Sequence, residues 1–151
     1  QGEIYKAKNS TFTANVRSAT FTTEIAGAYP EGAKVKSWVR TYTLNRGKSF
    51  VISDKYELNA ITNAGTSSNL ITYCKVTRVK PGLLKFEGDG FSLNMAYNKN
   101  LVTPEIEFIE VTDRTLKRYW PDGVTRVTLK FINPDIKGGQ AVTFTKAGQT
   151  E

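Results

Sequence analysis

Histidine is absent from this chain, and cysteine occurs once, as Cys74. Histidine is the commonest general base near neutral pH and the commonest metal ligand, so its absence excludes a Ser-His-Asp triad, a Cys-His pair and a histidine-zinc site. A single cysteine also excludes an internal disulfide and a metal site built from several thiolates. Cys74 lies in the strand-like stretch 70–76, which is more typical of a small strand residue than of a nucleophile. We therefore expect no cofactor and no metal ligand in this chain.

Long apolar runs are also missing. No run approaches the roughly 18 residues of a membrane-spanning helix, and no signal peptide stands at the start, so we expect no membrane partner. The chain begins at Gln1 without a methionine, which indicates a processed product or a piece of a longer protein. Only residues 112–120 could form a short helix, and their pattern is equally compatible with a strand.

Basic residues outnumber acidic ones by 21 to 14, which gives a net charge of +7. This balance favours polyanionic partners such as nucleic acid, anionic lipid or acidic polysaccharide. The basic residues are scattered, however, as on an ordinary solvated surface. Nucleic-acid binding would need aromatic and basic side chains interleaved on one platform, and Tyr73, Lys75 and Arg78 do not form one. We expect no nucleic-acid partner.

The fold class follows from strand-like segments that recur every roughly 8 to 12 residues between Gly, Pro and Asn turns. Residues 1–151 are predicted to form a single all-β domain, a two-sheet antiparallel β-sandwich of roughly a dozen strands with little or no helix. A barrel would share the spacing, but charged and apolar residues mixed on single faces favour sheets that each show one side to water. Outside the hairpin described next, we expect strands in residues 4–8, 11–16, 19–26, 70–79, 83–87, 91–97, 104–111, 124–132 and 140–145.

The longest strand signal is a hairpin over residues 35–54. Its turn is predicted at Asn45-Arg46-Gly47, because Asn and Gly tolerate the positive φ that hairpin turns require. Side chains alternate along a strand, so Trp38, Arg40, Tyr42 and Leu44 share one face. A buried Arg40 on a central strand would need a carboxylate or carbonyl partner.

Aromatic and basic side chains are the best candidates for ligand contact. A sugar can stack its apolar face on an exposed ring while an arginine or lysine meets an acidic substituent. The candidate carbohydrate contacts are Trp120, Tyr119, Arg118, Trp38 and Arg40. A tryptophan on a sandwich strand is more often part of the core, so a structural role for Trp38 and Trp120 stands beside this reading. The acidic residues show no spacing typical of an acid/base pair, and we assign no catalytic residue.

Four stretches carry a family resemblance: QGEIYKA at 1–7, IAGAY at 25–29, WVR at 38–40 with FVISD at 50–54, and EFI at 107–109 with Asp113, Leu116 and WPDGVTRV at 120–127. In this order they resemble the C-terminal β-sandwich region of heparinase II/III-like polysaccharide lyases. In that family the eliminating Tyr and His belong to an upstream helical toroid and its border with the β region, and a His-rich metal-binding stretch precedes the segment seen here. Without histidine, none of these residues can be carried over.

The resemblance implies a non-catalytic C-terminal sandwich of a bacterial lyase, secreted or periplasmic, that acts on acidic polysaccharide such as glycosaminoglycan. The lyase would abstract the uronate C5 proton and then eliminate the 4-linked sugar. The expected partners are the catalytic domain of the same polypeptide, on whose cleft the sandwich would pack, and acidic polysaccharide. The alternative is a free-standing module that binds carbohydrate or protein.

Overall fold

The structure is a computed structural model, and it describes residues 2–148. These residues form eleven strands and three short 3-10 helices, and no helix among them is long and apolar enough to cross a membrane. The elements are β1 Lys8–Ala14, β2 Ser18–Glu24, η1 Ala26–Ala28, η2 Glu31–Ala33, β3 Val35–Asn45, β4 Ser49–Leu58, β5 Ser67–Thr72, β6 Lys75–Lys80, β7 Leu83–Gly88, β8 Phe91–Tyr97, β9 Val102–Ile109, η3 Leu116–Arg118, β10 Val124–Phe131 and β11 Lys137–Lys146.

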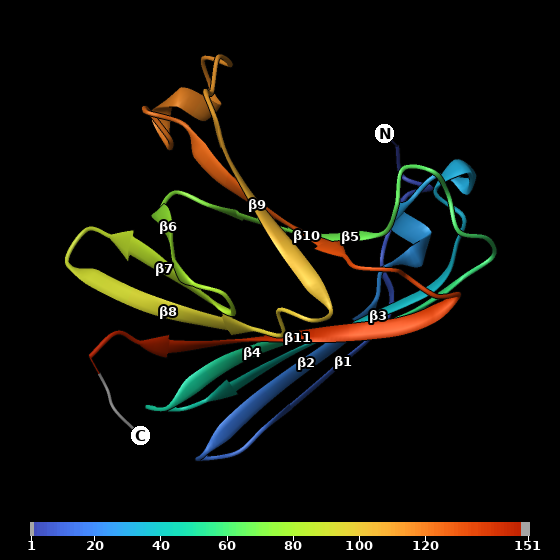
Figure 1. Cartoon of the computed structure of the whole chain (residues 1–151), viewed down its shortest axis with the longest axis horizontal. Helices are drawn as coiled ribbons and strands as arrows, with labels where there is room; N and C mark the ends of the chain where they lie inside the picture. Colours follow the sequence, from blue (N-terminus) through green and yellow to red (C-terminus); the bar gives the residue numbers. More distant parts are fainter. Residues whose placement is uncertain (1, 149–151) are drawn as a thin grey trace.

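The strands form two antiparallel sheets, which face each other in Figure 1. The large sheet has eight strands in the order β1-β2-β3-β4-β11-β8-β7-β6, and the small sheet has three in the order β5-β10-β9. All strand pairs are antiparallel, from the β1–β2 hairpin to the β9–β10 pair. The predicted all-β, two-sheet sandwich is therefore confirmed.

The predicted hairpin is present as β3 and β4, the longest adjacent pair of the large sheet. Their connection carries Gly47 at φ 73°, in the left-handed region that glycine adopts without strain. The register pairs Asn45 with Ser49 and, further along, Arg40 with Asp54. Because β3 pairs with β2 on its other edge, this strand is internal to the sheet, as its pattern indicated.

The core lies between the small sheet and the β4, β11, β8 and β7 strands of the large one. Its fully buried side chains come from both sheets and include Leu84, Met95, Val102, Val127, Leu129 and Val142. A second buried cluster joins Trp38, Tyr56 and Leu58, and Phe131 of β10 packs against it. The predicted strand at 124–132 is present as β10, in which Val127 and Leu129 face inward.

Two predicted strands were wrong in ways that matter for the topology. Residues 70–79 do not form one strand, because β5 ends at Thr72 and β6 begins at Lys75 in the other sheet. The chain crosses between the sheets at Tyr73 and Cys74, where the Cys74 N–H donates to Thr72 Oγ1 at 3.1 Å. Residues 4–7 are not a strand either, since the Tyr5 N–H turns back to the Gly2 carbonyl.

The connection between β9 and β10 settles the ambiguity over residues 112–120. The carboxylate of Asp113 accepts the backbone N–H groups of Thr115 and Leu116, both at 2.9 Å, and the short helix η3 follows. These bonds satisfy N–H groups that the first turn of a helix leaves without partners. The segment therefore forms a 3-10 turn at the tip of a loop that projects from the small sheet (Figure 1).

Candidate functional site

The most buried charged group of residues 2–148 is Asp54, whose residue is 1% exposed. Both of its carboxylate oxygens accept hydrogen bonds. The donors are Trp38 Nε1 at 2.9 Å, Arg40 Nε at 2.7 Å, Arg40 Nη2 at 2.9 Å, Ser68 Oγ at 2.8 Å and Gln140 Nε2 at 3.1 Å. Arg40 Nη2 also donates to Ser68 Oγ at 2.6 Å, so the group forms a closed network.

This network, the Asp54 network, joins the two sheets. Asp54, Trp38, Arg40 and Gln140 stand on β4, β3 and β11 of the large sheet, and Ser68 stands on β5 of the small one. Cross-strand pairing of Arg40 and Gln140 with Asp54 places all three on the same face. The partner of Arg40 therefore lies inside this domain, across its own hairpin.

The electrostatics of the network keep Asp54 ionised. Burial alone would raise the pKa of this carboxyl, but the hydrogen bonds and charge of Arg40, with the Trp38 and Ser68 bonds, outweigh it and hold the pKa below its ordinary value. A carboxylate sealed in this way, with both oxygens occupied, has no free lone pair facing a substrate. Its geometry is that of a structural link between the sheets.

A wide groove opens between the two sheets where they splay apart, near the β3–β4 turn. Its volume is about 790 Å³. Apolar side chains form most of its lining, among them Tyr42, Phe50 and Phe144. Lys48, Lys146 and Arg40 also line it, and its lining within residues 2–148 includes no carboxylate. The groove is therefore lined mostly by apolar side chains, and the charged side chains in its lining are basic.

A second hollow, of about 560 Å³, lies under the β9–β10 loop. Its lining includes Leu116 and Trp120 from that loop and the end of β5. Ile71, Thr72 and Tyr73 line both the hollow and the groove, so the two concavities share one wall. Tyr73 is 62% exposed on this wall and packs edge-on against Phe91, with ring centroids 6.4 Å apart.

The five predicted contact residues fall into two groups. Trp38 is 5% exposed and stacks on Tyr56, with ring centroids 5.2 Å apart, and Arg40 is held by Asp54 at the inner end of the groove. Arg118, Tyr119 and Trp120 lie together on the β9–β10 loop, where all three are exposed. Trp120 is 39% exposed and lines the hollow. The structure thus brings the second group together on a protruding surface and places the first in the interior.

Sequence reasoning missed Asp54 and the shared wall. Arg40 and Asp54 are equally far from Gly47, the centre of the turn that forms, whereas the predicted turn, centred on Arg46, would have paired Arg40 with Ile52. No such signal marked Tyr73, Lys48 or Lys146. Lys48 and Lys146 line one groove because β11 pairs with β4, and Tyr73 joins its lining where the chain crosses between the sheets at residues 73–74. Within residues 2–148, no three His, Cys, Asp or Glu side chains gather in a way that could hold a metal ion.

Comparison with known proteins adds a fold relationship. No protein-family model and no curated protein matches the sequence. Two solved structures of heparan sulfate lyase HepC from Pedobacter heparinus do match. A mutant of that lyase superposes with a TM-score of 0.62 at 14% identity, over 97% of this chain and 22% of the lyase chain.

This chain has the fold of part of a heparan sulfate lyase. The unmutated HepC structure agrees, with a TM-score of 0.61 at 13% identity over 93% of this chain and 22% of its own. The likeness to the heparinase-like lyase extends over both sheets, since it covers nearly all of the sandwich. It confirms at the level of fold the resemblance that the sequence motifs indicated. The chain spans 22% of the length of the lyase chains that it matches.

Proposed function

We propose that this chain is the non-catalytic β-sandwich of a heparinase-like lyase that cleaves acidic polysaccharide by β-elimination. The observation that carries the proposal is the fold match, which takes in 97% of this chain but only 22% of a heparan sulfate lyase. The rest of such a lyase would supply the chemistry. By the same resemblance, the parent enzyme would be secreted or periplasmic and bacterial, with the sandwich at its C-terminal end.

The side chains around the two concavities support a role without catalysis. β-Elimination begins when a base removes the C5 proton of a uronate, and a base must reach that proton within hydrogen-bonding distance. The chain has no histidine. The groove offers Lys48 and Lys146 and no carboxylate within residues 2–148, and the hollow offers Glu110 and Asp113, of which Asp113 already accepts two backbone N–H groups. Tyr73 packs against the ring of Phe91, a contact that supplies no acceptor for its proton.

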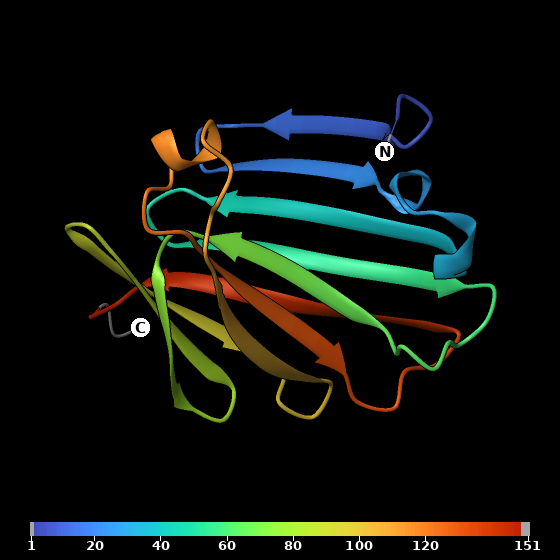
Figure 2. The same cartoon turned by 90° about the horizontal axis from the view of Figure 1, so that it is seen from above.

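An uncovered apolar face supports packing against a catalytic domain. The register aligns Phe12, Phe21 and Tyr42 across β1, β2 and β3 on the face that continues to Ile52 in the core. The small sheet lies over β4 and β11 and leaves β1 and β2 uncovered (Figure 2). Phe12 is consequently 67% exposed. We call Phe12, Phe21 and Tyr42 the aromatic row.

Exposed aromatic rings in register with a buried core are typical of an interface left open when a partner is absent. We propose that the partner is the catalytic domain of the same polypeptide, which would cover the aromatic row and complete the core of the large sheet. The groove starts at Tyr42, at the inner end of this row, and would then border the interface. In this arrangement the sandwich packs on the catalytic domain and lines one side of its cleft.

The alternative, a free-standing carbohydrate-binding module, is favoured by the β9–β10 loop. Tyr119 and Trp120 stand next to each other there, with ring centroids 6.4 Å apart and planes inclined by 60°. Both rings are exposed, and Arg118 precedes them. Exposed rings beside an arginine are suited to a sugar with acidic substituents.

A lyase assay tests the non-catalytic role. The purified chain is incubated with heparan sulfate, heparin and alginate, and unsaturated uronate is followed by its ultraviolet absorbance. We expect no product from any of the three, because we assign the residues that remove the C5 proton to the rest of the lyase polypeptide. A catalytically competent lyase of the same substrate class serves as the positive control. Product formation by the isolated chain would overturn the assignment of roles.

A further inference from the structure

We propose that the groove between the sheets binds a single-chain amphipathic anion, which is a hydrocarbon chain that ends in a carboxylate. This ligand is neither a polysaccharide nor a part of the lyase polypeptide, so the proposal goes beyond the proposed function. The apolar lining of the groove, its length and the position of its lysines carry the proposal.

Part of the lining of the groove is the hydrophobic core itself. Ile52, Cys74 and Phe86 belong to the buried core and also line the groove. Beside them lie apolar side chains that are only partly buried, and these come from both sheets: Tyr42, Phe50, Leu70, Leu93 and Phe144. A hydrocarbon chain between the sheets would therefore bury apolar surface that the sandwich leaves open to water.

The size and shape of the groove suit an extended ligand. Its volume of about 790 Å³ falls within the roughly 300–1,000 Å³ of small-molecule sites. Arg40, held by Asp54, lines its inner end, and Lys48 lines the groove near the β3–β4 turn. Asp54 and Lys48 are six residues apart, which corresponds to roughly 20 Å at the rise of a strand. The groove is therefore long enough for an extended chain.

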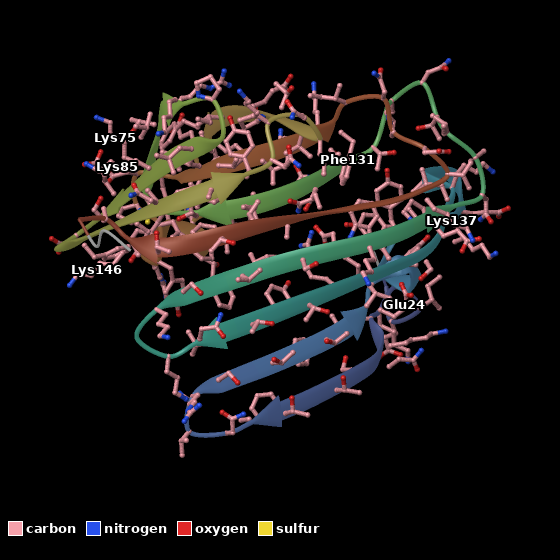
Figure 3. The ribbon with its side chains drawn as sticks, turned by 60° about the horizontal axis from the view of Figure 1, so that its bottom comes forward. Glu24, Lys75, Lys85, Phe131, Lys137 and Lys146 are labelled. Atoms are coloured by element: carbon pink, nitrogen blue, oxygen red, sulfur yellow. The ribbon has the colours of Figure 1, made fainter. Side chains whose placement is uncertain are left out.

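The lysines of the groove lie at one end of it. Phe144 of β11 pairs with Phe50 of β4, and Lys146 follows Phe144 on the same face, in register with Leu93 of β8. Lys48 is the last residue of the β3–β4 turn and lines the groove as well. Figure 3 shows Lys146 at the end of the large sheet where this turn lies. Both ammonium groups thus stand where the apolar lining ends.

These two lysines select an anionic head group. Neither Lys48 nor Lys146 forms a salt bridge within residues 2–148, and the lining of the groove there includes no carboxylate. The charge of Arg40 is already neutralised by Asp54. A carboxylate at the mouth would meet positive charge that has no other partner. The hydroxyls of a sugar, in contrast, would lose hydrogen bonds against the apolar lining.

Isothermal titration calorimetry with sodium laurate, below its micelle concentration, tests the groove. We expect laurate to bind saturably, with one molecule per chain. Octanoate has four methylenes fewer and should bind at least about tenfold more weakly, because each buried methylene contributes up to about fourfold in affinity. Dodecyltrimethylammonium joins the same chain length to a cationic head, and it should also bind at least about tenfold more weakly than laurate.

The double variant K48A/K146A should lose at least about tenfold in affinity for laurate and should no longer prefer laurate to dodecyltrimethylammonium. Leu44 is 39% exposed and lines the groove, so Leu44→Trp should fill the groove, weaken laurate binding and leave the buried core intact. The matched control is K55A/K99A, which removes the same charge from an outward position on β4 and from the β8–β9 turn. This control should keep its affinity within about twofold.

Equal losses in the two double variants would show attraction by net charge alone and would overturn the proposal. Unchanged affinity in both K48A/K146A and Leu44→Trp would place laurate outside the groove and would also overturn it. Absence of saturable laurate binding would overturn it and favour a segment of the rest of the polypeptide as the occupant. Circular dichroism confirms that each variant is folded. The uronate assay is independent of these outcomes, because it measures bond cleavage.

Discussion

Replacing Asp54 with alanine is expected to lower the free energy of unfolding by about 3–5 kcal/mol, the cost of leaving a buried charge without its partner. The substitution strands the guanidinium of Arg40, whose side chain is only 13% exposed. It also leaves Trp38 Nε1 and Gln140 Nε2 without an acceptor. Urea or thermal unfolding, followed by circular dichroism, measures the loss.

A smaller change isolates the link between the sheets. Ser68→Ala removes one donor to Asp54 and keeps the ion pair with Arg40, so we expect a loss of about 1 kcal/mol. The ratio of the two effects distinguishes a charge network from simple packing. A loss below about 1 kcal/mol for Asp54→Ala would contradict the role given to the network, because typical buried pairs cost several times more to break.

The same network determines how stability responds to acid. The folded-state pKa of Asp54 lies below its ordinary value, so this residue stabilises the fold above the unfolded-state pKa, near 3.9. As pH falls below that value the unfolded state binds the proton first, and stability is lost as pH falls further through the folded-state pKa. The Asp54→Asn variant should lose less stability than the parent chain between about pH 5 and pH 2.

Trp38 and Trp120 provide a second contrast, because the same side chain is removed from two environments. Trp38→Ala should cost about 3–5 kcal/mol, since it empties a site between Tyr56 and Phe131 and removes a donor to Asp54. Trp120→Ala should cost about 1 kcal/mol or less, because the ring is partly exposed on a loop. Unfolding curves for the two variants measure the difference.

The same pair separates structure from recognition. Trp120→Ala should stay folded and show weaker retardation in native gels that contain an acidic glycan. Trp38→Ala should lose retardation only to the extent that the variant unfolds. Trp38→Phe, which retains an aromatic ring in the core, serves as the control and should recover part of the stability. Equal destabilisation by Trp38→Ala and Trp120→Ala would contradict the burial on which the two roles depend.

Much of the fold could be predicted because its signals are local. The hairpin turn was predicted within one residue, because Gly47 accepts positive φ, although Asn45 ends β3 and the turn spans residues 46–48. The strand at 124–132 was predicted from the alternation of neighbouring positions. The crossing at Tyr73 and Cys74 could not be predicted, because the stretch 70–79 reads as one strand by propensity. Only the competition between two sheets for these residues, a tertiary effect, divides it into β5 and β6.

The candidate site was predictable only in part for the same reason. The sequence proposed Arg118, Tyr119 and Trp120 as contacts but left a structural role open for Trp120; the structure exposes all three, and their contact with glycan stays a prediction. The interior position of Trp38 depends on where the small sheet lies. The aromatic row could not be predicted, because the pattern of Phe12 and Phe21 is that of ordinary inward-facing strand residues. The sequence does not show that the small sheet stops before it reaches them.

The most direct test of the account is the solvent accessibility of the aromatic row in two settings. Hydroxyl-radical footprinting compares labelling of Phe12 and Phe21 in the isolated chain and in the longer lyase polypeptide to which we assign it. We expect strong labelling of both rings in the isolated chain and protection in the longer one, while exposed Tyr119 is labelled in both. Equal labelling of Phe12 and Phe21 in the two settings would contradict the proposed packing on a catalytic domain.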